Sequence, residues 1–305
     1  MTANPNADPV FAIDFTSEGM TAAFVTPDGV ELDSAGFDLI DFHAGEDSAL
    51  DKLLTLLAAK ARAGGAVSAA ALAMACDLNA GRSAITDFPG AAWLNGVELP
   101  KLLAEALGVP VVMERRAVVQ LCYDRAMLGL PEDCLAVGCY IDTHYETAIW
   151  HRGAPLVGRN GLAGNIAHMT IHDREDNCFC GKAGCVDLYG AGTRLQQIHN
   201  MIFPDTPRDD LFVDHGEHPI VQDYLRMMAY PIAIELNILD PDFLVLGGSI
   251  PSMAGFPRAL LQQEIRAHVY SPEQDRELIV LPSASGMISG TVCAAQYARM
   301  KLGLL

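Results

Sequence analysis

The order of hydrophobic and polar positions predicts two groups of strands, each followed by alternating helices and strands. In the first group, short apolar runs are separated by turn residues such as "PDG" at 27–29, which predicts a meander of three strands. The later apolar run "VSAAALAMAC" favours a buried strand, although its alanines leave a helix open. The elements expected here are strands at 10–15, 20–29, 30–39, 67–76 and 109–114, and helices at 48–65, 97–108 and 116–129.

The second half repeats this order, with "RGAP" as a hairpin turn between its first strands. A long apolar helix contains Pro231, which predicts a kink. The elements expected here are strands at 134–142, 145–153, 242–248 and 278–284, and helices near 191–203, 217–239, 256–269 and 287–302. Two such groups predict a two-lobed α/β fold with a cleft between the lobes.

Composition and charge narrow the classes of function. The chain has 305 residues, half of them hydrophobic, which suffices for one large or two medium domains. A net charge of −18 repels phosphate backbones, so direct binding to nucleic acid is not expected. The N-terminus does not resemble a signal peptide, and no run of about 18 apolar residues predicts a membrane helix. We therefore expect a cytoplasmic protein without membrane partners, in which stable disulfides are rare.

The stretch "NCFCGKAGC" places Cys178, Cys180 and Cys185 on one tight loop. Cysteines separated by one residue seldom fit disulfide geometry with each other. Three thiolates on one loop favour a structural Zn²⁺ site, which requires a fourth ligand. His168 is the candidate for that ligand, and His172 competes with it. The alternative is three free thiols that are partly buried.

The frame "GLAGNIAHMTIHDREDNCFCGKAGCVDLYG" at 161–190 resembles the signature of the ROK family of repressors, open reading frames and sugar kinases. That signature reads G-x-x-G-E-x-G-H, then about nine residues, then C-x-C-G-x-x-G-C-x-E. The order of the surrounding strands also resembles the family, and short stretches such as "GFPRALL" resemble its allose-kinase branch. The resemblance implies an actin/hexokinase-like, ribonuclease H-like sugar-kinase fold with a small lobe at 1–116 plus 288–305 and a larger lobe at 117–287.

The resemblance also implies a set of site residues. His168, Cys178, Cys180 and Cys185 would bind a structural zinc ion beside a sugar pocket. The sugar would contact residues that correspond to the family's sugar ligands: Asp87, Glu114, Arg115, Asn165, His168 and Asp187. The nucleotide would lie against residues of three turns: Asp14, Glu18, Asp142, Thr143, Gly247 and Gly248. The family further implies a homodimer.

Several of these positions depart from the family pattern. Arg116 stands where the family has its catalytic Asp, and an arginine stays protonated and cannot act as a base. Loss of a general base typically costs about 10² to 10⁴ in rate. Glu18 replaces a Thr in the first phosphate turn, and "DTHYE" at 142–146 replaces the glycines of the second. No base and no complete phosphate turn is therefore expected.

These departures favour a catalytically degenerate sugar-kinase-like protein, a pseudokinase, that binds a small sugar or sugar phosphate in the cleft. One alternative is an active hexose kinase that uses MgATP and an unrecognised base, since Asp14 and the turn "LGGSI" at 246–250 are retained. Another is a sugar sensor or regulatory protein. A DNA-binding repressor is not expected, because only nine residues precede the first strand.

Overall fold

The computed structural model describes residues 8–17, 19–43, 48–270 and 279–304, and these form two compact units. Unit 1 comprises residues 1–129, 157–163 and 287–305, and unit 2 comprises 130–156 and 164–286. Helix α3 (Arg116–Met127) thus belongs to unit 1 together with the strand that precedes it. The two lobes implied by the resemblance, at 1–116 plus 288–305 and at 117–287, stay a prediction.

Unit 1 is built on a five-stranded sheet in the order β3-β2-β1-β4-β7. Strands β1, β2 and β3 form the predicted antiparallel meander, whereas β4 and β7 run parallel to β1. Its main elements are β1 (Val10–Phe15), β2 (Gly19–Val25), β3 (Glu31–Asp38), α1 (Ala49–Ala63), β4 (Ala69–Met74), α2 (Leu99–Leu107), β7 (Val111–Arg115), α3 and α9 (Gly290–Leu302).

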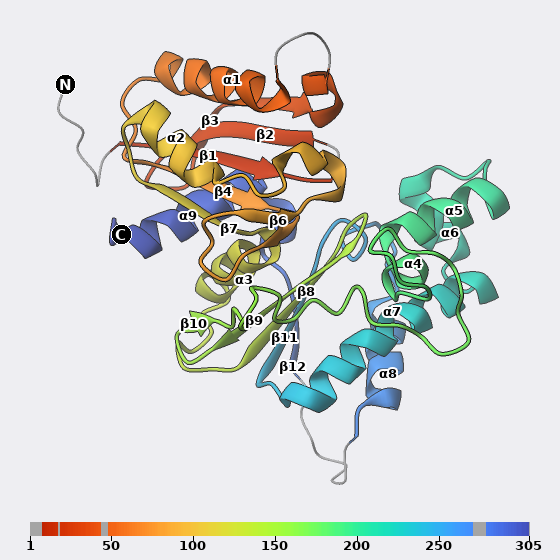
Figure 1. Ribbon diagram of the computed structural model, residues 1–305. Coiled ribbons are helices and arrows are strands. Elements are labelled where there is room, and N and C mark those ends of the chain that lie inside the picture. The colour runs from red at the N-terminus through yellow and green to blue at the C-terminus, as the bar shows by residue number, and fades with distance from the viewer. Residues whose placement is uncertain (1–7, 18, 44–47, 271–278, 305) are drawn as a thin grey trace. The chain divides into compact units, whose positions relative to one another are not determined.

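The alanine-rich run is a strand, so the helix alternative for it is wrong. β4 lies between β1 and β7, and pairing with both neighbours satisfies its backbone groups. Its small side chains also suit close packing of α9, which contacts β1 and β4. Figure 1 shows α1 on one side of this sheet and α9 on the other.

The core of unit 1 follows the alternation of side chains along β1. Phe11, Ile13 and Phe15 point into one apolar cluster, which also contains Leu53 of α1 and Leu103 of α2. Asp14 points to the opposite face, where its carboxylate lies against Gly290 at the start of α9. A short hairpin that the sequence did not predict, β5 (Asp77–Leu78) with β6 (Ile85–Asp87), follows β4.

Unit 2 is built on a second five-stranded sheet in the order β10-β9-β8-β11-β12. β8 pairs antiparallel with β9 and parallel with β11, which in turn pairs parallel with β12. Its elements are β8 (Ala136–Ile141), β9 (Tyr145–His151), β10 (Ala154–Pro155), α4 (Asp187–Gly190), α5 (Gly192–Ile202), α6 (Leu211–His215), α7 (Pro219–Leu239), β11 (Phe243–Gly247), α8 (Arg258–His268) and β12 (Ile279–Pro282).

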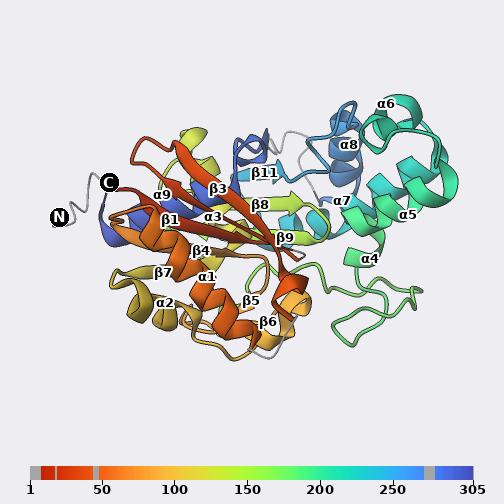
Figure 2. The ribbon, with the colours of Figure 1, turned by 90° about the horizontal axis from the view of Figure 1, so that it is seen from above.

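Helix α7 supplies much of the core of unit 2. Tyr224, Met228 and Ile232 lie on its buried face and pack in one cluster with Cys139 of β8 and Leu246 of β11. α7 also contacts α5 and α8, and Figure 2 shows these helices grouped together. The long helix predicted at 217–239 is confirmed, with its N-terminus at Pro219 capped by the His218 side chain. The sheets and helices therefore confirm the predicted two-lobed α/β fold with two mixed sheets.

Candidate metal centre and ligand site

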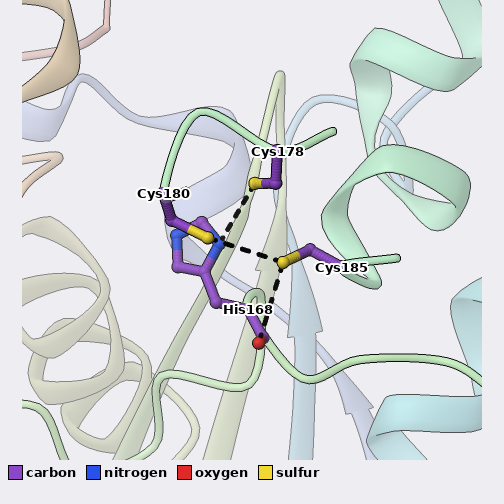
Figure 3. Close-up of side chains that lie close together, drawn as sticks. All are labelled: His168, Cys178, Cys180 and Cys185. Atoms are coloured by element: carbon purple, nitrogen blue, oxygen red, sulfur yellow. Dashed lines mark hydrogen bonds between the residues drawn. The ribbon is translucent and has the colours of Figure 1, made fainter. Parts of the chain in front are cut away.

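One histidine and three cysteines come together in unit 2. The ligand atoms of His168, Cys178, Cys180 and Cys185 all lie within 4.8 Å of one another (Figure 3). His172, the competing fourth ligand, is instead exposed and pairs with Asp173 at 3.0 Å. The structure therefore selects His168.

Two short backbone pairings build this cluster. In the first, Asn177 bridges Ala183, and the N–H of Cys178 donates to the carbonyl of Lys182 at 2.8 Å, which closes the loop that carries the first two thiols. In the second, the N–H of Val186 donates to the carbonyl of Met169 at 2.8 Å. This second pairing brings the segment after His168 against the segment that carries Cys185.

Gly184 permits the close approach within this loop. Its φ is +72°, and a Cβ there would lie 2.4 Å from the carbonyl oxygen of Arg174. A side chain would therefore clash with backbone and would also adopt a left-handed conformation that L-residues disfavour. The glycine that the sequence places one residue before Cys185 is thus required by the fold of the loop.

Two of the distances among these atoms match the edges of a tetrahedral zinc site. Zn–S bonds of about 2.3 Å and Zn–N bonds of about 2.0 to 2.1 Å imply tetrahedral edges of about 3.8 Å between sulfurs and about 3.5 Å between sulfur and nitrogen. The Sγ atoms of Cys180 and Cys185 are 3.6 Å apart, and the Sγ of Cys178 is 3.5 Å from Nδ1 of His168. Four side chains would fill the coordination sphere. Such an ion would hold the loop together and would have no open position at which to activate a substrate.

The three thiols differ in acidity within the protein. Burial raises the pKa of Cys178 and raises that of Cys185 to about 12. Burial also acts on Cys180, but hydrogen bonds from the Lys182 backbone and the neighbouring thiols outweigh it, so the pKa of Cys180 is lowered. A bound divalent cation would override these differences, because a coordinated thiol is deprotonated outright.

In unit 1, Arg116, which the resemblance aligns with the family's catalytic Asp, is part of an ion pair. Nε of Arg116 lies 3.2 and 3.4 Å from the two carboxylate oxygens of Asp14. Both side chains are largely buried, with 16% and 9% of their surface exposed. A Cβ at Gly290 would lie 2.0 Å from the same carboxylate, so the start of α9 closes over Asp14. The Asp14 carboxylate is therefore held in place by Arg116 and by the start of α9.

Glu114 is held in the same way by residues that the sequence analysis missed. Nε of Arg82 lies 2.7 Å from one carboxylate oxygen, and the hydroxyl of Tyr297 donates to the other at 3.1 Å. Arg115 is also buried, and it donates to the carbonyl of Ala163 at 3.1 Å. Nothing in the sequence around Arg82 pointed to this role, because Arg82 lies in the turn between β5 and β6 and its partner Glu114 lies on β7.

In unit 2, the turn after β8 is tied to the glycine turn after β11. The carboxylate of Asp142 accepts a hydrogen bond from the backbone N–H of Ser249 at 2.5 Å. Gly248 adopts φ of +99° and packs so closely on Ile141 that a Cβ would lie 2.4 Å from its backbone nitrogen. The carbonyls of Asp142 and Thr143 accept from the first N–H groups of α5. The Asp142 carboxylate and these two carbonyls therefore accept hydrogen bonds from other residues of unit 2.

Asp187, at the start of α4 just after the last cysteine of the loop, bonds to residues of the same turn. It is 3% exposed, and one carboxylate oxygen accepts from the N–H of Tyr145 at 2.8 Å. The other oxygen lies 2.7 Å from Nδ1 of His144. The turn "DTHYE" stands out in the sequence for its missing glycines, and that pattern gives no role to His144.

The remaining predicted site residues are placed as follows. Asp87 is exposed at the end of β6, where the Asn95 amide donates to it at 3.4 Å. Asn165 is half-buried in the segment that leads to His168. Gly247 ends β11, directly before Gly248. Glu18 lies outside the described residues.

No helix in the described ranges is long and apolar enough to cross a membrane. A segment of 104 residues is 31% identical to an N-acetylmannosamine kinase of Vibrio cholerae and covers 32% of this chain and 36% of that protein. This chain thus matches only about a third of the length of that relative, which does not establish the same activity here.

Two solved structures share the fold over almost the whole chain. A ROK family glucokinase from Streptomyces griseus, in complex with glucose and AMPPNP, superimposes with a TM-score of 0.76 at 19% identity, covering 96% of this chain and 99% of that one. A ROK family protein from Streptococcus pneumoniae TIGR4, in complex with sucrose, gives a TM-score of 0.75 at 19% identity, covering 97% and 100%. The model of the ROK family matches residues 44–301. The cluster of His168 with three cysteines is typical of that family's zinc-binding motif. This chain therefore belongs to the ROK family and has the fold of its sugar kinases.

Proposed function

We propose that this protein binds a small sugar or sugar derivative and has lost phosphoryl transfer. The observation that carries the proposal is the ion pair between Arg116 and Asp14 at 3.2 Å. Phosphoryl transfer from ATP needs a base for the attacking hydroxyl and groups that stabilise the transferred phosphoryl and its metal ion. By the resemblance, one member of this pair occupies the place of the base, and the other is the carboxylate retained in the first phosphate turn.

Arg116 opposes catalysis in two ways. Its guanidinium cannot accept the proton of a sugar hydroxyl. It also neutralises Asp14, which a kinase would need as an acceptor or as a partner of Mg²⁺. Both effects act on the chemical step and leave a neutral sugar free to bind.

The turn 142–146 supports the proposed loss of phosphoryl transfer independently of Arg116. A phosphate turn works by presenting backbone N–H groups to the ligand, which requires small residues. Here the Asp142 carboxylate already accepts from the N–H of Ser249, and its charge would repel a triphosphate at that place. Nucleotide binding would therefore have to displace an internal hydrogen bond.

The sugar-binding role follows from what the family motif retains. Asp87, Asn165 and Asp187 keep hydrogen-bonding capacity at the family's sugar positions, and the zinc loop fixes the backbone on either side of His168. Glu114 and Arg115 are buried and bonded within unit 1, so we assign them to holding the wall of the site. A homodimer, a cytoplasmic location and similarity to the allose-kinase branch stay predictions.

A second candidate function is an active hexose kinase that uses MgATP. The turn "LGGSI" at 246–250 and Asp14 favour it, because both are retained from the family pattern. A third, a sugar sensor or regulatory protein, would share the sugar site and differ only in its partners.

A ligand panel separates these functions. We expect hexoses or amino sugars to raise the unfolding temperature of the zinc-loaded protein, because a ligand that binds only the folded state stabilises it. MgATP should give no shift, and a coupled assay should detect no sugar-dependent formation of ADP. Sugar phosphorylation that disappears in Asp14→Ala would overturn the proposal and establish the kinase. A panel in which no sugar shifts the protein would overturn the sugar-binding part.

A further inference from the structure

We propose that the Lys182 side chain positions His168 and offsets the negative charge of the zinc centre, and thereby sets how tightly the loop holds the ion. Lys182 is not a zinc ligand. It occupies one of the two variable positions of the motif C-G-x-x-G-C, so the sequence pattern gives it no role. The inference concerns the metal centre alone and does not depend on the proposed sugar binding.

The first step concerns the main chain of Lys182, which bonds to two of the zinc-ligand cysteines. Its carbonyl accepts a hydrogen bond from the N–H of Cys178 at 2.8 Å. Its own N–H donates to the sulfur of Cys180. Both bonds use backbone groups, so any residue other than proline could make them. They bring position 182 to the metal centre but do not require a lysine there.

The second step concerns the side chain, which reaches the other segment of the centre. Nζ of Lys182 donates to the carbonyl of His168 at 2.7 Å, across 14 positions of the chain. His168 is the one ligand of the four that lies outside the loop 178–185. This bond therefore ties the loop to the segment that carries its fourth ligand. A short or apolar side chain at position 182 could not make it.

The third step concerns the charge around that carbonyl once zinc is bound. The same His168 oxygen accepts from the thiol of Cys185 at 3.8 Å (Figure 3). A coordinated thiol loses its proton, so Cys185 could no longer donate, and its negative sulfur would face an oxygen lone pair. Three thiolates also outweigh a divalent cation, which leaves the centre with excess negative charge. The Lys182 ammonium, 2.7 Å from this oxygen, offsets both effects.

The fourth step concerns the size of this effect. Lys182 is the only lysine in the sequence of unit 2, which spans 130–156 and 164–286. Residues that orient metal ligands typically contribute about 10- to 100-fold to metal affinity. Lys182 is exposed, so water and salt screen its charge. We therefore expect an effect of about tenfold on zinc affinity, and a smaller one at high salt.

Competition with a chelator of known affinity would measure zinc binding at low and at high salt. Three variants change the side chain in steps: Lys182→Met keeps its length without the charge, Lys182→Gln keeps a donor without the charge, and Lys182→Arg keeps both. Arg266→Met is the matched control, because Arg266 is an exposed cation on α8 in the same unit. Urea unfolding of the metal-free form of every variant separates a merely structural role from one that acts on the metal.

We expect Lys182→Met to bind zinc about tenfold more weakly than the native chain at low salt, with a smaller difference at high salt. Lys182→Gln should lie between the two, and Lys182→Arg should recover most of the affinity. Arg266→Met should leave it unchanged, and the metal-free forms should unfold alike.

Equal zinc affinity of the native chain and both neutral variants would overturn the inference. A loss that Lys182→Arg does not recover, or that the metal-free form matches in stability, would also overturn it, because the loop and not the metal would then need Lys182. If Lys182→Met does not fold, Lys182→Gln and Lys182→Arg decide in the same way. A native chain that binds no zinc would overturn the inference together with the metal centre, without bearing on sugar binding.

Discussion

The ion pair between Asp14 and Arg116 is predicted to stabilise unit 1 by a measurable coupling energy. Arg116→Met would remove the guanidinium and leave the Asp14 carboxylate largely buried beside Gly290. Breaking a fully buried pair costs about 3 to 5 kcal/mol, whereas exposed pairs contribute about 0 to 1 kcal/mol. Because 16% and 9% of these two side chains are exposed, we expect a loss of about 2 to 3 kcal/mol. That corresponds to a fall of about 4 to 12 °C in unfolding temperature for a unit of this size.

A double-mutant cycle isolates the pair from other effects of each substitution. Asp14→Asn, Arg116→Met and the double variant would be compared by calorimetry, and the double variant should lose less than the sum of the single losses. A coupling energy of about 1 to 3 kcal/mol is expected for residues in contact. The pair of Asp223 and Arg226 is the control, because its atoms are 3.3 Å apart but its side chains are about half exposed. Its coupling should not exceed about 0.5 kcal/mol. Additive losses at Asp14 and Arg116 would refute the ion pair and remove the main support for the proposed function.

Three further predictions concern the metal, the backbone and alkaline pH. Metal analysis should find about one zinc ion per chain, and Cys180→Ser should lose it, since a structural site needs four ligands; full zinc retention would contradict the site. Gly248→Ala should destabilise the protein by about 2 to 4 kcal/mol, because the new Cβ would meet Ile141 and the backbone φ is +99°. The control Gly29→Ala, at φ of +81° but in open space, should cost only about 1 kcal/mol. Equal losses of the two variants in urea unfolding would refute the packing argument. Burial raises the pKa of Cys122 from 9.0 to about 11, so the unfolded chain releases this proton first and stability falls as the pH rises from about 9 to about 11. Cys122→Ala should reduce that fall by about 2 to 3 kcal/mol in unfolding measured across this range, and an unchanged fall would contradict it.

The zinc cluster could be predicted from the sequence because its geometry is local. Three ligands lie within one loop, and glycines at fixed places mark where that loop turns. The choice between His168 and His172 was left open by spacing alone. It depends on the pairing of Met169 with Val186, which the sequence pattern does not encode.

The ion pairs could not be predicted in the same way. Arg116 and Asp14 are 102 positions apart, on different elements of the unit 1 sheet and its helices. The sequence showed that Arg116 departs from the family pattern and that Asp14 is retained, but not that the two residues contact each other. Arg82 was missed altogether, because a single arginine in a turn gives no periodic signal and its partner Glu114 is brought to it only by the fold. Long-range contacts of this kind follow from tertiary packing, which propensity and spacing do not capture.

The internal bonds of the polar residues also bear on how much nucleotide affinity can remain. A kinase site leaves donors and acceptors available until the nucleotide arrives. Here Asp14 is held by Arg116, and Asp142 is held by the N–H of Ser249. Releasing one hydrogen bond to a charged group costs about 1.5 to 3 kcal/mol. A nucleotide that had to displace one of these bonds would bind about 10- to 100-fold more weakly than at a site with free groups. Under the proposed function, a neutral sugar would displace neither bond, so weak binding of ATP and binding of a sugar would follow from the same contacts.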